Sequence, residues 1–497
     1  MTKLISEDAS WDFKDIQWLA EEVEIIGREE MGMDPFPWQI EIVSSDNMID
    51  IYSTSWPISY PHWSYGKKYL QSYLPYKAGK SGLAYEVVLP GCPSLISLHE
   101  DNTFALMAIT IPHAGVGHSH IFKNNYLFSG TSVDTGSITD YLDFAKTYIL
   151  QCEDKYGVGR VERILDACHA LQYSSMTLPH NKKLSLANEQ KRFNDRQRYA
   201  EAEYNEIWNS VPTQQKPAAA EPERVSPGLP ESNLLYFIEK HSPILLPWQR
   251  EIVRIVRKLA QYRYPSVQCS VVHESAAVYS HNFCTRRLHE KGLISDGAML
   301  EVIVSTANVT YQGAYDRWNG FNIYTLGINI ADDIVRMCTS PTAEDIKWFP
   351  DIAGNQKPME TLRYAWENFR DESFIKQFLS PKVMRDMKMF RLEDDHNQDY
   401  YEVVAIHDDE GYKAIRTSLG NEYLPERVLP DIRVTGAQMH GNRILELTHY
   451  TDPGMPLAQA DKIKTMSYIH DLWGHRVSMV EMTRDGKYSV KAGSYIG

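Results

Sequence analysis

The sequence predicts an α+β fold: a predominantly α-helical main body followed by a small C-terminal domain with the ferredoxin-like order βαββαβ. Three observations predict it. Apolar residues recur at helical spacing through much of the chain. A few short apolar runs in the first third are typical of strands. After about residue 389, strand and helix patterns follow one another in the ferredoxin-like order.

The N-terminal part, residues 1–210, is expected to mix helices with short strands. Trp18–Met31 has the pattern of an acidic amphipathic helix, and Leu83–Leu89 and Ser94–Leu98 have the pattern of strands. Ile138–Tyr156 predicts a helix with one apolar face, and Val161–Leu171 predicts another. This part therefore forms the α/β portion of the main body.

The middle of the chain combines a linker with a helical block. Residues 211–232, which follow a charged helical pattern at Glu189–Trp208, are rich in Pro, Ala and Glu and predict a linker or long surface loop. Residues 233–388 predict mainly helices. The strongest are Ser242–Tyr262, with Pro247 in its first turn, and about Gln268–His289. Further helices are expected near 331–338, 359–371 and 371–379.

The C-terminal part, residues 389–497, is expected to form the small ferredoxin-like domain. Four segments have strand patterns: Tyr401–Ile406, Ile432–Gln438, Arg443–Tyr450 and Arg476–Met482. Two have helix patterns: Glu410–Leu419 and Leu457–Trp473. Such domains commonly serve interaction or regulation, but a fold does not by itself define a function.

Composition excludes several classes of function. The 497-residue chain has a formal net charge of -14, which argues against general binding to nucleic acid or anionic membrane. Its six cysteines include no C-x-x-C pair, so a zinc ribbon or disulfide framework is not expected. No secretory signal, membrane span, P-loop or G-x-G-x-x-G fingerprint is visible. We therefore expect a cytoplasmic protein with reduced thiols.

One heptapeptide occurs twice in similar form. PWQIEIV at 37–43 and PWQREIV at 247–253 match at six of seven positions. The similarity fades on both sides, so we interpret it as coincidence or a reused helix start and not as a repeat architecture.

Two histidine-bearing segments are the best candidates for chemistry. In VVHESAAVYSH, residues 271–281, Glu274 and His281 are seven apart, which is two helical turns and nearly one face. Their Cα atoms would lie about 10 Å apart, so His281 either reaches a shared metal or supports a ligand from behind.

In IPHAGVGHSHIFKNNYLF, residues 111–128, His113 and His118 are five apart. A regular α-helix would separate them by about 140°, so they converge only through a π-bulge or a turn loosened by Gly115 and Gly117. Two histidines and a glutamate form the ligand set of thermolysin-type zinc sites. His120 and His273 are additional candidates as ligands or proton carriers.

The spacing departs from that of known zinc hydrolases. Ala277 stands where H-E-x-x-H has its second histidine, and Ala114 stands where a zinc hydrolase keeps its general base. The alternative is that these histidines are buried, hydrogen-bonded core residues. A catalytic pair of Cys168 and His169 is disfavoured because adjacent helical residues point apart.

Several long segments resemble the SpoVR family, the relatives of stage V sporulation protein R. They are YPHWSYGKKY, GLAYEVVLPGCPSLISL, HAGVGHSHIFKNNYLF, PWQREIVRIVRKLAQYRYP, WFPDIAG and DESFIKQFLSPKVMRDMKMF. The resemblance runs from about Trp11 into the C-terminal domain. It implies a cytoplasmic protein from a bacterium, phage or plasmid. It also implies a role in spore cortex formation or stress response, and partnership with a PrkA-type serine kinase and a von Willebrand A-like protein.

The chain also departs from the family pattern. Family members read N-E-G-W-A-x-F-W-H where this chain has HESAAVYSH, which keeps Glu274 and His281 but loses Gly and Trp. The family's E-G-W-A is similar to the glutamate-bearing helix of some zinc peptidases, so the resemblance favours Glu274 as a ligand. A histidine-containing stretch before Asn-Val is replaced by Val304–Ala307, which leaves open whether the pocket is active, rebuilt or idle.

Two hypotheses follow from these observations. In the first, His113, His118 and Glu274 hold one divalent metal, zinc above others, with help from His281, and the protein is a divergent zincin-like amide hydrolase. No catalytic residue is assigned, because Glu274 cannot easily be both ligand and base. In the second, the protein is a non-enzymatic scaffold or regulatory partner of a serine kinase complex. A stoichiometric metal ion would favour the first.

Overall fold

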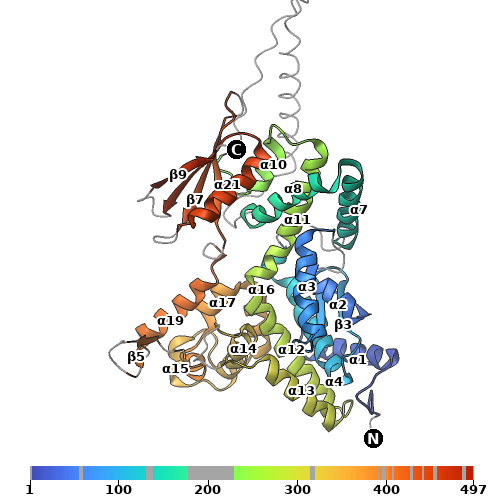
Figure 1. Cartoon of the computed structure of the whole chain (residues 1–497). Coiled ribbons are helices and arrows are strands. Elements are labelled where there is room, and N and C mark those ends of the chain that lie inside the picture. Colours follow the sequence, from blue (N-terminus) through green and yellow to red (C-terminus); the bar gives the residue numbers. More distant parts are fainter. Residues whose placement is uncertain are drawn as a thin grey trace, which may run out of the picture. The chain divides into compact units, whose positions relative to one another are not determined.

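The computed structural model describes residues 3–54, 60–129, 138–176, 229–313, 320–389, 391–394, 399, 401–405, 408–425, 429–438, 441–451, 456–483 and 489–495. The chain forms two compact units, each built from two stretches (Figure 1). Unit 1 comprises Met1–Lys146 and Pro265–Leu424, and unit 2 comprises Thr147–Tyr264 and Pro425–Gly497. The sequence-based division was instead into consecutive segments. The predicted helix Glu189–Trp208 and nearly all of the predicted linker 211–232 lie outside the described residues.

Unit 1 begins with the amphipathic helix that the sequence predicts. Helix α1 (Phe13–Ile25) starts at Asp12, whose side chain accepts the amide protons of Lys14 and Asp15. It buries Ile16, Leu19 and Val23 and continues into the π-helix η1 (Ile26–Glu30). The predicted strands are present as β2 (Glu86–Leu89) and β3 (Ser94–His99).

Unit 1 contains a three-stranded sheet of order β1-β3-β2, and its strands β2 and β3 contact the histidine-bearing segment Pro112–His118. Strand β1 (Trp38–Val43) is parallel to β3, and β2 is antiparallel to β3 with Glu86 opposite Leu98. Helices α2 (Ser45–Thr54) and α3 (Trp63–Lys77) are connected to this sheet, and α2 contacts β2, β3 and α3. The register fixes Glu86 at the first residue of its strand.

The rest of unit 1 is helical, as predicted. Its helices are α4 (Phe104–Ile111), η2 (Pro112–His118), α5 (Ser119–Asn124), α6 (Tyr126–Ser129), α12 (Ser270–Glu290), α13 (Asp296–Val309), α14 (Ile323–Thr339), α15 (Ala343–Trp348), α16 (Pro358–Asn368), α17 (Asp371–Phe378), α18 (Pro381–Asp386) and α19 (Asp409–Glu422). Helix α12 is central: it contacts α4, η2, α13, α14, α16 and α17, and Figure 1 shows it surrounded by several of these helices.

Buried polar contacts fix the position and start of α12. The side chain of Asp371, 1% exposed at the start of α17, accepts the amide proton of Val272 at 2.9 Å. The hydroxyl of Ser275 donates to the carbonyl of Gly327 at 2.8 Å and accepts the indole N–H of Trp366 at 3.2 Å. Together these contacts join α12 to α14, α16 and α17, so the first turn of α12 has a defined position.

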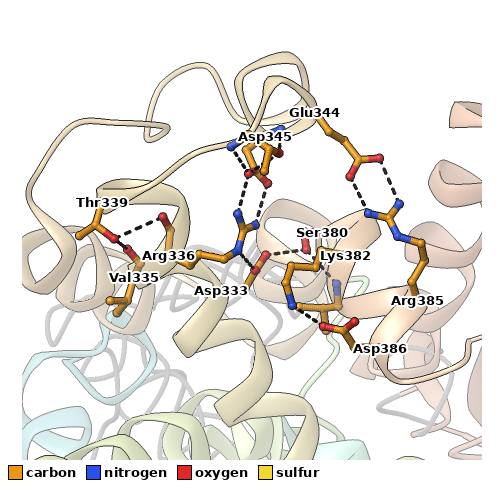
Figure 2. Close-up of polar contacts among 12 residues, drawn as sticks. Asp333, Val335, Arg336, Thr339, Glu344, Asp345, Ser380, Lys382, Arg385 and Asp386 are labelled. Carbon is orange, nitrogen blue, oxygen red and sulfur yellow. Dashed lines mark hydrogen bonds and ion pairs between the residues drawn. The ribbon is translucent and has the colours of Figure 1, made fainter.

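A charged network joins α14 to α15 and α18 (Figure 2). The guanidinium of Arg336 makes two hydrogen bonds to Asp345, at 2.7 and 2.8 Å, and one to Asp333 at 2.7 Å. Asp333 also accepts a hydrogen bond from Ser380 at 2.6 Å. Because both carboxylates are buried, this network has the paired, hydrogen-bonded form that buried charges require.

Unit 2 joins helices to a four-stranded sheet. It contains most of α7 (Ile138–Tyr156) and α11 (Pro247–Gln268), with α8 (Val158–Leu171), the 3₁₀ turn η4 (Gln172–Ser175), α10 (Leu234–His241) and α21 (Gln459–Trp473). The sheet order is β6-β7-β8-β9, from β6 (Asp431–Ala437), β7 (Leu445–Thr451), β8 (Val477–Thr483) and β9 (Ser489–Tyr495). None of the described helices in either unit is long and apolar enough to cross a membrane.

The structure confirms the α+β class but does not have the predicted ferredoxin-like arrangement. The predicted first strand, β5 (Tyr401–Ala405), pairs with β4 (Arg391–Asp394) in a separate two-stranded sheet, and it belongs to unit 1 with α19. A split βαβ motif requires a strand between the two parallel strands. Here β7 and β8 pair directly along seven residues, from Leu445–Val477 to Thr451–Thr483, so no strand fits between them.

Candidate metal centre

The two histidines of the first segment converge because the chain leaves α-helical geometry at that point. Residues Pro112–His118 form a π-helix, in which the amide of Ser119 donates to the carbonyl of Ala114, five residues earlier. Residues five apart therefore come to one face, and the His113 and His118 rings lie 4.6 Å apart between centroids. The sequence left open whether the two histidines converge through a π-bulge or through a turn loosened by glycine, and the structure has the π-helical form.

Glycine allows the π-helix to approach α12. A Cβ atom at Gly117 would lie 2.3 Å from the Cα of Ala277, closer than real Cβ atoms come to any neighbour. On α12, Ala277 lies one turn after His273 and Glu274. The small residues at this crossing therefore place both histidines of η2 beside the glutamate of α12.

The carboxylate of Glu274 lies among three imidazoles. Its Oε2 is 3.4 Å from Nε2 of His113 and 3.8 Å from Nε2 of His118, and its Oε1 is 3.4 Å from Nδ1 of His273. All are largely buried, with side-chain exposures of 9%, 10%, 9% and 15% for His113, His118, Glu274 and His273. The structure thus brings together His113, His118 and Glu274 and adds His273.

A second carboxylate, Glu86 on β2, completes the cluster and was missed by the sequence analysis. Its Oε1 lies 3.2 Å from Nε2 of His113, the same nitrogen that faces Glu274. The one available signal was a single charge inside the apolar strand LAYEVVL. Only the sheet register places that charge against η2, which lies 26 residues further along the chain.

His281 lies behind His113 and does not face the carboxylates. Its Nδ1 is 3.1 Å from Nδ1 of His113, and its Nε2 is 3.2 Å from the hydroxyl of Thr306 on α13. One of the two facing Nδ1 atoms must carry a proton for this hydrogen bond to form. The sequence left open whether His281 binds the metal or supports a ligand, and the structure has the supporting arrangement. His281 contacts Nδ1 of His113, the ring nitrogen that faces away from the carboxylates, and so orients the His113 ring.

His120 is not part of the cluster. Its Nδ1 accepts the amide proton of Asp34 at 3.0 Å, and its Nε2 lies 3.2 Å from Glu367. The Cys168–His169 pair is also disfavoured, because burial raises the pKa of the Cys168 thiol and so opposes formation of a thiolate.

The electrostatics of the cluster favour an ionised Glu274 and neutral imidazoles at His118, His273 and His281. Burial opposes ionisation of Glu274, but the neighbouring His118, His113 and His273 lower its pKa to about 2. Burial lowers the pKa of His118 and His281 well below the usual histidine value, and that of His273 as well. A carboxylate and neutral imidazoles are the protonation states that bind a metal cation.

Glu86 and His113 are shifted in the opposite direction. Burial raises the pKa of Glu86 to about 7. Burial alone would lower the pKa of His113, but Glu86 and Glu274 together raise it above its usual value. His113 therefore favours its protonated form between the two carboxylates, and a metal cation that binds its Nε2 must displace that proton.

The geometry of the cluster allows it to hold a metal ion. Tetrahedral zinc with bonds of about 2.0–2.1 Å has ligand atoms roughly 3.4 Å apart. The His113 nitrogen lies 3.2 and 3.4 Å from its two carboxylate oxygens. Two triplets, Glu86–His113–His118 and His118–His273–Glu274, have ligand atoms within 4.8 Å of one another. Glu86 Oε2, Glu274 Oε2 and His118 Nδ1 are buried with no hydrogen-bond partner among the described residues, as expected where a cation or water belongs.

A serine, histidine and aspartate also meet elsewhere in unit 1, but with the wrong polarity for a nucleophile. Nε2 of His99 lies 3.0 Å from the Ser45 hydroxyl, and its Nδ1 accepts the amide proton of Asp101 at 3.1 Å. Because Nδ1 accepts this hydrogen bond, the ring's N–H is on Nε2 and donates to Ser45. Tyr76 donates to the same hydroxyl at 3.0 Å, so Ser45 is not activated.

Comparison with known proteins gives matches along nearly the whole chain. The family model described as SpoVR like protein matches residues 10–427, and that of the SpoVR-like C-terminal domain matches residues 430–484. The chain is 41% identical over 489 residues to the uncharacterized protein YcgB of Escherichia coli strain K12, covering 98% of this chain and 95% of that protein. No solved structure matches significantly.

Proposed function

Because this chain belongs to the SpoVR family, we propose that its buried His/Glu cluster binds one zinc ion and hydrolyses an amide bond. His113, His118 and Glu274 would be the protein ligands, the set found in thermolysin-type sites. The observation that carries the proposal is the π-helix at Pro112–His118, which turns both histidines toward Glu274 on α12. π-Helical turns are rare in proteins, and a large share of those that are found lie at functional sites.

His281 would act as a positioning residue. Its hydrogen bond to Nδ1 of His113 leaves Nε2 of His113 facing Glu86 and Glu274. Through its own Nε2 it contacts Thr306, which holds the His281 ring in turn. Such supporting hydrogen bonds fix the orientation and the tautomer of a ligand.

Glu86 would act as the general base. The sequence pattern has no base at the expected position, where Ala114 stands, and this argued against hydrolysis. When bound, zinc lowers the pKa of a coordinated water and polarises the substrate carbonyl. The Oε2 atom of Glu86 is buried beside the cluster and has no hydrogen-bond partner in the part of the chain that the structure describes. Glu86 would take a proton from the attacking water and pass it to the amine that leaves as the C–N bond breaks. The products are then a carboxylic acid and an amine.

The proposal is tested by amide hydrolysis with the zinc-loaded, full-length chain. N-acetylated dipeptides and cell-wall fragments would serve as substrates, with release of the new amine measured. Glu86→Gln should retain zinc but lose about 100-fold to 10,000-fold in kcat. His289→Gln is the control: His289 lies on α12, the helix that carries Glu274, in an exposed ion pair with Asp296, and this variant should retain full activity. Equal activity of Glu86→Gln and wild type would contradict the assignment of the base.

One surface favours a second function. In it, the protein would be the partner of a PrkA-type serine kinase and a von Willebrand A-like protein, in the stress response or sporulation of a bacterial host. Helix α13 exposes Leu300, Ile303 and Val304, with exposed fractions of 63%, 55% and 52%. Apolar side chains three and four apart on one helical face are a common protein-binding feature. Membership of the SpoVR family supports this proposed partnership, which would place the protein in the cytoplasm.

Titration calorimetry with a purified PrkA-type kinase tests this second function. Leu300→Ser combined with Ile303→Ser should abolish binding while leaving the metal cluster intact. Equal affinity of the double variant and the wild type would refute a role for this surface.

A further inference from the structure

A cavity of about 520 Å³ in unit 1 is bordered by the same glutamate that borders the metal cluster. Its wall is made by the end of α2, one face of α3 and the start of β2; the lining residues are Tyr52, Ser53, Lys68, Gln71, Ser72, Glu86 and Val87. This volume lies in the range of small-molecule sites, about 300–1,000 Å³. Because Glu86 also lies 3.2 Å from His113, a molecule in the cavity would be adjacent to the cluster.

Two buried polar atoms of the cavity wall have no hydrogen-bond partner among the described residues. The side chain of Ser53 belongs to a residue that is only 2% exposed, and its hydroxyl makes no hydrogen bond to any described residue. The same is true of Glu86 Oε2. Leaving a buried polar group unsatisfied costs about 1–3 kcal/mol, so such groups in a native protein require an explanation. A polar ligand in this cavity would satisfy both.

Helix α3 contributes one cation and two neutral hydrogen-bonding groups to the lining of the cavity. Lys68, Gln71 and Ser72 are three and four residues apart on α3, so they share a helical face. Lys68 is exposed and makes no ion pair with any described residue. The cavity is therefore lined by a positive charge from α3, a carboxylate from β2 and a hydroxyl from α2.

We propose that this cavity binds a small amide that carries a free carboxylate, with the carboxylate at Lys68 and Gln71 and the amide between Ser53 and Glu86. This inference rests on the proposed hydrolase function, because it names the substrate class of that site. A single lysine with neutral donors suits a carboxylate. Phosphate sites that contain a lysine commonly add arginines or several backbone amides at a helix N-terminus, and the lining of this cavity includes no arginine.

Binding of two matched probes to the full-length protein tests the proposal. The probes are N-acetyl-L-alanyl-L-alanine and its C-terminal amide, which differ only in the carboxylate charge. Calorimetry would be done with zinc-loaded protein and after chelator treatment. Lys68→Met removes the charge and keeps the apolar stem. Lys67→Met, its exposed neighbour on α3 that does not line the cavity, is the control.

We expect the acid to bind about threefold to fivefold more tightly than the amide, the size of an exposed ion pair. Lys68→Met should remove this preference and leave the zinc content unchanged, whereas Lys67→Met should keep the preference. Ser53→Ala should weaken both probes.

Equal binding of acid and amide, equal loss in the two lysine variants, or tighter binding of inorganic phosphate than of the acid would each overturn the proposal. The two proposals can fail separately. An acid preference set by Lys68 in a protein that holds no zinc would support the cavity assignment and refute the hydrolase.

Discussion

Replacing Gly117 by alanine should separate the two helical segments that carry the candidate metal centre. The new Cβ would lie 2.3 Å from the Cα of Ala277, 2.9 Å from its backbone nitrogen and 3.0 Å from its Cβ. Ordinary contacts of a Cβ atom begin at 3.4 Å, so η2 and α12 must separate by about 1 Å. The obstacle is backbone, which cannot rotate out of the way.

The cost of this shift follows from packing and from metal geometry. Overpacking of a buried contact costs about 1–3 kcal/mol, and we expect a loss of unfolding free energy near the upper end. Metal–ligand distances tolerate errors of only about 0.2 Å, so zinc affinity should fall about tenfold or more. Urea denaturation measures the first effect, and competition with a zinc-binding dye measures the second.

The control is Gly66→Ala on α3. Outside the adjoining turns of α3, no atom of the described residues lies within 4 Å of a Cβ at Gly66, so this substitution adds no close contact between elements. It should stabilise the protein by about 0.5–1 kcal/mol, because glycine disfavours a helix interior. If Gly117→Ala were as stable as Gly66→Ala and bound zinc equally well, the close crossing of η2 and α12 would not be what holds the cluster together.

Three further predictions follow from contacts of individual side chains. His281→Ala should lower zinc affinity about tenfold to 100-fold while leaving one site, measured by competition titration; unchanged affinity would remove its positioning role. Because burial raises the pKa of Asp371 to about 7, the folded state keeps a proton that the unfolded chain releases near pH 4, and the stability that this contributes is lost as the pH rises toward 7. In the wild type, the unfolding free energy should therefore fall by up to about 1.4 kcal/mol per pH unit between pH 4 and 7, and Asp371→Asn should lack this fall. Urea denaturation at several pH values measures it, and an equal dependence of the unfolding free energy on pH in both proteins would contradict the prediction. Arg336→Met should cost about 3 kcal/mol because it leaves Asp333 and Asp345 buried without their partner, whereas Lys382→Met, whose pair with Asp386 is at the surface, should cost under about 1 kcal/mol; equal losses would contradict the role of burial.

Helices were the most predictable part of this protein, because their signals are local. The apolar spacing of Ile138–Tyr156 and the pattern from Gln268 to His289 correspond closely to α7 and α12. The predicted strand Ser94–Leu98 is β3. Each of these elements shows its pattern within one continuous segment, so no knowledge of its neighbours was needed.

The candidate site was predictable only in part. Residue types and spacing pointed to His113, His118 and Glu274, and the structure brings these three together. That His113 and His118 converge through a π-helix depends on the packing of Gly117 against α12, which the sequence suggested only as one of two routes. Glu86 was missed because its approach to His113 depends on the pairing of β2 with β3.

Strand pairing was the part that the sequence could not predict. Strand β5 was expected beside the C-terminal strands but pairs with β4, because pairing depends on distant partners that local pattern does not identify. The repeated heptapeptide shows the same dependence. Its first copy contributes Trp38–Val43 to strand β1, and its second copy begins helix α11 at Pro247. The helix start that the sequence suggested therefore holds for one copy only, and tertiary context overrides the local preference at the other.

The metal content of the purified, untagged protein tests the central claim most directly. Elemental analysis would compare the wild type with His113→Ala, Glu274→Ala and the exposed control His289→Ala. The account predicts about one zinc ion per chain in the wild type and in His289→Ala, and loss of that ion in the other two variants. A folded wild-type protein that takes up no zinc, or that keeps it in both cluster variants, would contradict the account.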